Sequence, residues 1–166
     1  MRDRDAAKNT LPGGGHSTLN ETTLSGAEVA AQSVQNRAEA SRTLRRILLV
    51  EDDTSLAQLE AGILAARGYA VAIATSGEMA LTTLHHAIPD LVLLDLDLSG
   101  AVTGWDVLKA LRSTSSAPVL LTSAESAVRR HIRTQGESRS TLDHLPKPYH
   151  MEALLKRIER MLAITP

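Results

Sequence analysis

The chain has 166 residues, 43% of them hydrophobic, a formal net charge of -1 and no cysteine. This length and composition allow one domain of ordinary size with a real core, and exclude a second full domain beside it. The near-neutral charge gives no overall field that favours nucleic acid or an anionic membrane, and the lack of cysteine excludes disulfides and thiolate metal sites.

Residues 1–43 differ in composition from the rest of the chain. Ser, Thr, Asn and Ala dominate this segment, and its basic and acidic residues balance. Such a segment buries too little apolar surface to offset the entropy of ordering it. Ser25 and Glu28 have the spacing of a capping box, which indicates at most a weak helix after them. We therefore predict a flexible or weakly helical extension over residues 1–43.

Targeting signals are not found in the sequence. The stretch up to His16 has no apolar segment of the kind that a secretory signal needs, and no run has the length that spans a membrane. We therefore expect a cytoplasmic protein that has neither a membrane nor a nucleic acid as its partner.

From Leu44 onward, short apolar runs alternate with amphipathic stretches, and we predict one domain over residues 44–166. The runs are rich in Val, Ile and Leu, which is typical of strands buried on both faces of a parallel sheet. They are ILLV (47–50), YAVAIA (69–74), LVLL (91–94), VLLT (119–122) and a weaker fifth run at 142–145. Five strand-helix units predict an open α/β sheet, because the eight units of a barrel need about twice this length.

Apolar residues at helical spacing predict the helices between these strands. The four stripes are Leu56, Leu59, Ile63 and Leu64; Met79, Leu81 and Leu84; Trp105, Leu108 and Leu111; and Leu154, Leu155, Ile158 and Leu162. A further, mostly polar helix is expected from Glu125 to Gln135.

Polar residues follow the apolar runs at the point where each predicted strand ends. They are Glu51, Asp52 and Asp53 after the first run, Asp95 after the third, Ser123 and Ala124 after the fourth, and Lys147 after the fifth. The carboxyl ends of parallel strands meet at one edge of the sheet, where ligands bind. We therefore expect carboxylates, one hydroxyl and one lysine to assemble there, with Asp53 as the N-cap of the next helix.

Three carboxylates at close range repel one another unless a cation lies between them. Oxygen ligands without His or Cys suit a hard ion, and a few carboxylates completed by water suit Mg²⁺ better than Ca²⁺. A lysine and a hydroxyl next to the metal could hold a tetrahedral dianion, and a carboxylate can itself be a nucleophile. These parts indicate phosphoryl transfer, whose catalysis is mostly positioning and charge neutralisation.

The motifs RILLVEDD, LVLLDLDLSG, PVLLTSA and LPKPY, in this order and spacing, resemble the receiver domain of two-component response regulators. The resemblance covers about Leu44 to Leu162. It implies the flavodoxin-like receiver fold, which is a five-stranded parallel sheet of order 2-1-3-4-5 with helices on both faces.

The resemblance also implies roles for the acidic residues. Asp95 matches the phosphoacceptor, and Glu51 and Asp52 match the acidic pair that holds Mg²⁺ together with Asp95. Asp97 matches the position whose backbone carbonyl binds the metal, and its side chain lies where the family tunes the lifetime of the phosphoryl group, as does Glu125.

Four further positions match the family. Ser123 corresponds to the hydroxyl residue that turns inward to bond the phosphoryl group, and Lys147 to the lysine that pairs with this group. Pro148 matches a proline whose preceding peptide bond is cis, and His144 falls where the family has its switch aromatic.

The sequence departs from the family pattern in two segments. The loop SGAVTG (99–104) is longer than usual and has Ser99 where proline is common. The stretch between Ser123 and His144 is also longer than usual, which affects the expected switch surface more than the chemistry.

As no output domain follows the receiver pattern in this sequence, we expect a stand-alone receiver rather than an enzyme. Its donor would be a histidine kinase or a histidine phosphotransfer protein, and its downstream partner an unknown protein. Two alternatives are a haloacid-dehalogenase-like phosphatase that uses the DLD motif (95–97), and a degenerate receiver that binds partners without being phosphorylated. Against the phosphatase, its motif closes the first strand of its fold, whereas here it closes the third.

Overall fold

A computed structural model of the chain describes residues 44–125, 128–134, 136 and 138–164. The extension predicted over residues 1–43, with the weak helix after Ser25, lies outside the described residues.

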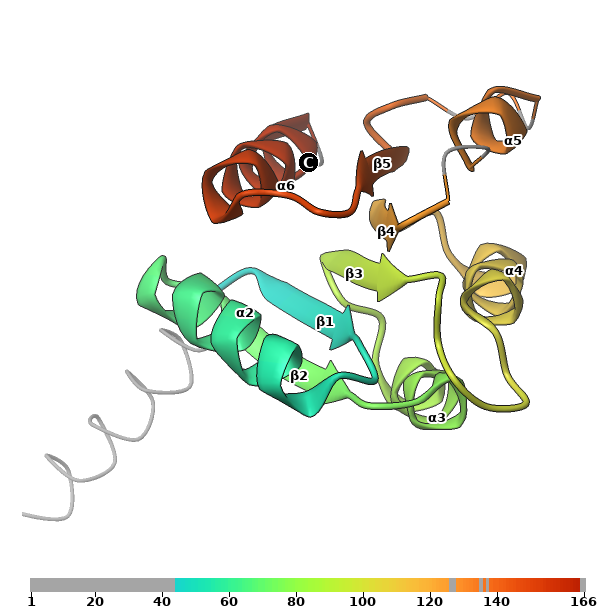
Figure 1. Ribbon diagram of the computed structural model, residues 1–166, viewed down its shortest axis with the longest axis horizontal. Helices are drawn as coiled ribbons and strands as arrows, with labels where there is room; N and C mark the ends of the chain where they lie inside the picture. Colours follow the sequence, from blue (N-terminus) through green and yellow to red (C-terminus); the bar gives the residue numbers. More distant parts are fainter. Residues whose placement is uncertain (1–43, 126–127, 135, 137, 165–166) are drawn as a thin grey trace, which may run out of the picture. The chain divides into compact units, whose positions relative to one another are not determined.

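Five parallel strands form one sheet in the order β2-β1-β3-β4-β5 (Figure 1). The strands are β1 (Arg46–Val50), β2 (Ala70–Ala74), β3 (Leu91–Asp95), β4 (Val119–Ser123) and β5 (Leu142–Pro146). This order confirms the predicted fold, and it places β1 and β3 side by side in the middle of the sheet.

Among the described residues, four helices connect the strands and a fifth follows β5, and together they cover both faces of the sheet (Figure 1). They are α2 (Thr54–Ala66), α3 (Gly77–His86), α4 (Gly104–Thr114), α5 (Val128–Thr134) and α6 (Met151–Ile164). Helices α2 and α6 lie on one face, and α3, α4 and α5 on the other. Within the part of the chain that the structure describes, none of the helices combines the length and the apolar character needed to cross a membrane.

Side chains alternate along the central strands between two apolar layers. Leu48, Val92 and Leu121 pack in the layer under α3, α4 and α5. Ile47 and Leu93 pack in the layer under α2 and α6. This period of two explains why β1, β3 and β4 read as continuous apolar runs, because helices cover both of their faces.

The expectation of burial on both faces is wrong for β2. Ala72 and Ile73 are exposed, and Ile73 keeps 36% of its surface accessible. The reason is position, since β2 is an edge strand and the helices cover the middle of the sheet more fully than its edge.

Two residues of the predicted apolar stripes are also exposed. Leu59 in α2 is 57% exposed and Met79 in α3 is 47% exposed. The buried face of α2 consists of Ala57, Glu60 and Leu64, which have the i, i+3, i+7 spacing of one helix face. Leu59 is one position away from that face. The prediction that Leu59 belongs to the buried stripe of this helix is therefore wrong.

Local features join the strands to the loops at the carboxyl edge of the sheet. Asp53 caps α2 as predicted, since its carboxylate accepts hydrogen bonds from the backbone N–H groups of Ser55 (2.9 Å) and Leu56 (3.1 Å). At Gly104, the first residue of α4, a Cβ atom would lie 2.5 Å from the carbonyl oxygen of Asp95. Only glycine allows α4 to begin this close to the end of β3.

A pair of leucines in α2 tests this description of the core. Leu64→Ala, at a fully buried position, should lower the free energy of unfolding by about 2–5 kcal/mol, because it leaves a cavity between α2 and the sheet. Leu59→Ala in the same helix should change it by no more than about 0.5 kcal/mol. Urea unfolding followed by circular dichroism measures both, and equal losses would contradict the assignment of the buried face.

Candidate functional site

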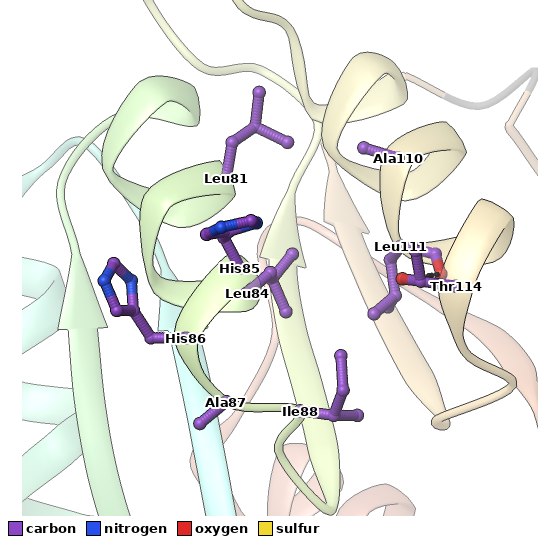
Figure 2. Close-up of a pocket in the computed structure, with 9 residues that line it drawn as sticks. All are labelled: Leu81, Leu84, His85, His86, Ala87, Ile88, Ala110, Leu111 and Thr114. Carbon is purple, nitrogen blue, oxygen red and sulfur yellow. Dashed lines mark hydrogen bonds between the residues drawn. The ribbon is translucent and has the colours of Figure 1, made fainter.

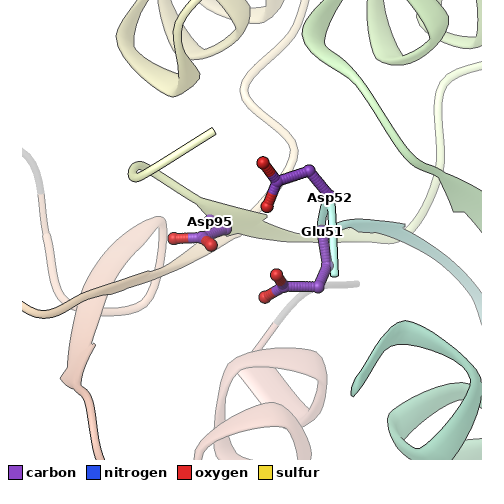
Figure 3. Close-up of side chains that lie close together, drawn as sticks. All are labelled: Glu51, Asp52 and Asp95. Atoms are coloured by element: carbon purple, nitrogen blue, oxygen red, sulfur yellow. The ribbon is translucent and has the colours of Figure 1, made fainter. Parts of the chain in front are cut away.

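Three carboxylates meet at the carboxyl edge of the sheet (Figure 3). Asp95 is the last residue of β3, and Glu51 and Asp52 follow the neighbouring β1. Each offers an oxygen within 4.8 Å of the others. Glu51 and Asp95 are buried, at 3% and 2% exposure, and Asp52 is half-buried. The structure therefore brings together the acidic residues that the sequence predicts to meet.

Lys147 extends into this cluster from the loop that follows β5. Its Nζ lies 2.7 Å from Oδ2 of Asp95 and 3.1 Å from Oε2 of Glu51. Its backbone N–H donates to the carbonyl of Ser123 at the end of β4 (2.8 Å), and the Lys147–Pro148 peptide bond is cis. One ammonium thus contacts two buried carboxylates that come from two different strand ends.

The charges of the cluster shift the pKa values of its members. Burial, and then the neighbouring charge of Asp95, raise the pKa of Glu51. Burial alone would lower the pKa of Lys147, but its hydrogen bonds and charge interactions with Asp95 and Glu51 raise it. Hydrogen bonding from Ser99 lowers the pKa of Asp52. Three carboxylates and one ammonium leave an excess of negative charge that favours a cation.

A divalent metal ion fits this donor set. Glu51, Asp52 and Asp95 form the one group of three such side chains, among the described residues, that could share an ion. All three ligands are oxygens and no imidazole or thiolate takes part, which suits Mg²⁺ completed by water. The contribution of the Asp97 carbonyl, implied by the resemblance, stays a prediction.

The side chain of Asp97 connects the loop after β3 to the end of β4. Its carboxylate accepts hydrogen bonds from the backbone N–H of Ala124 (2.8 Å) and from the hydroxyl of Ser123 (3.4 Å). Its own N–H donates to Oδ1 of Asp95 (2.9 Å). Ser123 is fully buried and also accepts a bond from the N–H of Glu125 (2.8 Å). The predicted hydroxyl therefore lies beside Asp97 in this structure.

His144 lies inside the molecule. Its side chain is 3% exposed, and neither ring nitrogen has a hydrogen-bond partner among the described atoms. Burial, and then the nearby Arg129, lower the pKa of His144, so the imidazole is neutral near pH 7. The position predicted to act as a switch thus holds a buried, neutral ring without a partner among the described atoms.

Sequence reasoning missed a buried acid next to the lysine loop. Glu60 in α2 is 1% exposed and accepts a hydrogen bond from the Tyr149 hydroxyl at 2.7 Å. Burial raises the pKa of both groups. The helical spacing could have indicated this burial. Glu60 is one helical turn from Leu56 and from Leu64, on the face that packs on the sheet.

A cavity of about 350 Å³ lies between α3 and α4, away from the acidic cluster, and is lined mainly by apolar residues together with His85 and His86 (Figure 2). The two imidazoles point in different directions, with perpendicular rings 5.7 Å apart. Within the described ranges they are not part of a group of three or more side chains that could hold a metal.

Comparison with known families identifies the class of protein. The family model of the response regulator receiver domain matches residues 47–159, which is more than half of the chain. The chain therefore belongs to the response regulator receiver family.

Curated relatives from mycobacteria are similar over the same part of the chain. The DNA-binding response regulator MtrA of Mycobacterium tuberculosis is 35% identical over 118 residues, which are 71% of this chain and 50% of MtrA. The sensory transduction protein RegX3 of the same species is 38% identical over 116 residues, which are 70% of this chain and 50% of RegX3. The matched region thus spans about half the length of these relatives.

Solved receiver structures have the same fold. The chemotaxis protein CheY4 of Vibrio cholerae superposes with a TM-score of 0.63 at 27% identity, over 72% of this chain and 99% of that one. A CheY-like receiver domain from Methanospirillum hungatei gives a TM-score of 0.63 at 25% identity, over 73% of this chain and 95% of that one.

Metal binding by the acidic cluster can be measured through stability. Mg²⁺ should raise the thermal midpoint of the wild type, because a ligand that binds only the folded state stabilises it. Asp52→Asn should lower the affinity for Mg²⁺ by at least about tenfold, since even outer-shell residues of metal sites contribute this much. Asp90→Asn, a control at the amino end of β3 where the carboxylate pairs with Arg46, should keep the full shift. Equal shifts in the two variants would contradict the metal site.

The buried Glu60 predicts a dependence of stability on pH. Because burial raises its pKa in the folded state, its contribution is fully present below its ordinary value of 4.5 and is lost as pH rises through the raised value. Glu60→Gln, which can still accept from Tyr149, should therefore gain stability relative to the wild type as pH rises from 4.5 to neutral. The control is Glu152→Gln, at an exposed position in α6. A difference between Glu60→Gln and wild type that stays constant over this range would refute the assignment.

Proposed function

We propose that Asp95 accepts a phosphoryl group from a histidine kinase or a histidine phosphotransfer protein. The chain would then signal by protein–protein interaction or pass the group on in a relay, with the receiver in residues 44–166. The observation that carries the proposal is the ammonium of Lys147 at 2.7 Å from Asp95, in a cluster where Glu51 and Asp52 share one possible metal position with Asp95.

The transfer is an in-line displacement at phosphorus. A carboxylate oxygen of Asp95 forms the new O–P bond, while the P–N bond of phosphohistidine breaks and its electron pair returns to the imidazole nitrogen, which takes up a proton. The product is an acyl phosphate on Asp95. Lys147 offsets the negative charge beside the acceptor, and Mg²⁺, when bound, supplies further neutralisation of the phosphoryl oxygens.

The conformational response to phosphorylation of Asp95 would involve the groups around Asp97. Ser123 has to give up its 3.4 Å bond to Asp97 in order to bond the phosphoryl group. His144 lies on β5 in register with Leu121, two residues before Ser123 on the neighbouring strand. We propose that these two side chains respond together and reshape the surface formed by α5, β5 and α6.

The phosphatase alternative is less well supported. The chain belongs to the receiver family, and the Asp97 carboxylate accepts bonds from Ala124 and Ser123. A degenerate receiver would not need the acidic pair, the acceptor and the lysine in one cluster. A stand-alone role remains a prediction, and so does independence from nucleic acid, because MtrA and RegX3 are about twice as long as the region that matches this chain.

Direct phosphorylation tests the acceptor. With Mg²⁺ and phosphoramidate, whose P–N bond imitates that of phosphohistidine, the wild type should gain the mass of one phosphoryl group in intact-protein mass spectrometry. Asp95→Asn should gain none. Removal of Mg²⁺ by chelation should slow the gain strongly, because the charge on the phosphoryl oxygens is then less neutralised.

The matched control is Asp53→Asn. It removes a neighbouring carboxylate but keeps a good N-cap for α2, so its phosphorylation should equal that of the wild type. Undiminished labelling of Asp95→Asn, or none of the wild type, would refute the acceptor assignment. Multiple turnover of a small phosphate ester that Asp97→Asn abolishes would favour the phosphatase.

A further inference from the structure

A cationic pocket lies between α5, β5 and α6, among residues that phosphoryl transfer does not use. Its volume is about 270 Å³. Arg129 of α5, Arg139 of the segment before β5 and Arg157 of α6 line it, together with Asp143 and His144 of β5. None of these five residues contributes a carboxylate or the lysine of the acidic cluster.

The pocket carries an excess of positive charge. Asp143 is buried, and although burial opposes its ionisation, hydrogen bonding from Arg157 and the charges of Arg157 and Arg160 lower its pKa. Both arginines contact its Oδ2. Asp143 thus offsets Arg157 within the lining, which leaves the exposed side chains of Arg129 and Arg139 as the charges available to a ligand. A pocket with this balance favours an anion.

His144 lies in the wall of the same pocket and is 97% buried. Both of its ring nitrogens are themselves buried and have no partner among the described atoms. The imidazole is therefore next to the pocket, where its ring signals report an anion that binds there.

We propose that this pocket binds a small phosphate-bearing anion, with Arg129 and Arg139 as its charge partners. Guanidinium groups bind phosphate oxygens through paired N–H donors, and several of them can approach a tetrahedral anion from different sides. Pockets for drug-sized molecules begin at about 300 Å³, and this pocket is slightly smaller, so its volume suits inorganic phosphate or a compact phosphomonoester better than a nucleotide. The proposal does not depend on phosphorylation of Asp95.

The test is a titration of the full chain labelled with ¹⁵N-histidine, without Mg²⁺ and at constant ionic strength. Inorganic phosphate should shift the ring signals of His144, assigned with His144→Phe, along a saturable curve, and chloride should not. A second titration uses glycerol phosphate, which is a phosphomonoester. Whichever of the two ligands binds more tightly shows whether the pocket prefers free phosphate or a phosphomonoester. The same shift in Asp95→Asn separates this pocket from the acidic cluster.

Paired variants locate the binding. Arg129→Gln combined with Arg139→Gln should weaken phosphate binding by at least about tenfold, because hydrogen bonds to charged groups contribute this much. Arg130→Gln, an exposed neighbour in α5 outside the lining, should bind like the wild type. If the double variant does not fold, Arg139→Gln alone replaces it. No saturable shift in the wild type, or equal affinity in the double variant, would overturn the proposal.

Discussion

Mutual repulsion between the buried carboxylates of Glu51 and Asp95 is the constraint on which the arrangement of this molecule depends. The two residues come from neighbouring strands of a parallel sheet, so the topology itself forces them together. Lys147, which follows the strand at the far edge, reaches both of them. The remaining negative charge favours a cation at the same edge, and the phosphoryl transfer proposed for Asp95 would depend on this balance of charge.

The sheet connects this edge to the cationic pocket through one strand. β5 carries His144 in the pocket and leads within three residues to Lys147 in the acidic cluster. Its neighbour β4 ends at Ser123, whose carbonyl accepts the N–H of Lys147 and whose hydroxyl lies beside Asp97. A change at Asp95 and an anion bound beside His144 would therefore act on the same pair of strand ends, which gives the two sites a short physical route of communication.

Membership of the receiver family and the function of this chain rest on different observations. The fold and the family follow from the sheet order and from the match over residues 47–159. A fold supports many functions, so the function has to be argued from the site. Here the site brings three carboxylates and a lysine together, which supports the proposed transfer, whereas the match covers only about half the length of the mycobacterial relatives.

The sequence by itself determined the strands, their parallel arrangement and the meeting of Glu51, Asp52, Asp95 and Lys147, because apolar periodicity reports which elements are buried and parallel strands end at one edge. Only the tertiary structure decided that Ile73 and Leu59 are exposed, that Glu60 is buried against Tyr149, and that His144 has no partner. These outcomes depend on how far each helix covers the sheet and on which loops meet. Periodicity describes one element at a time, whereas burial and pairing are set between elements that are distant in the chain.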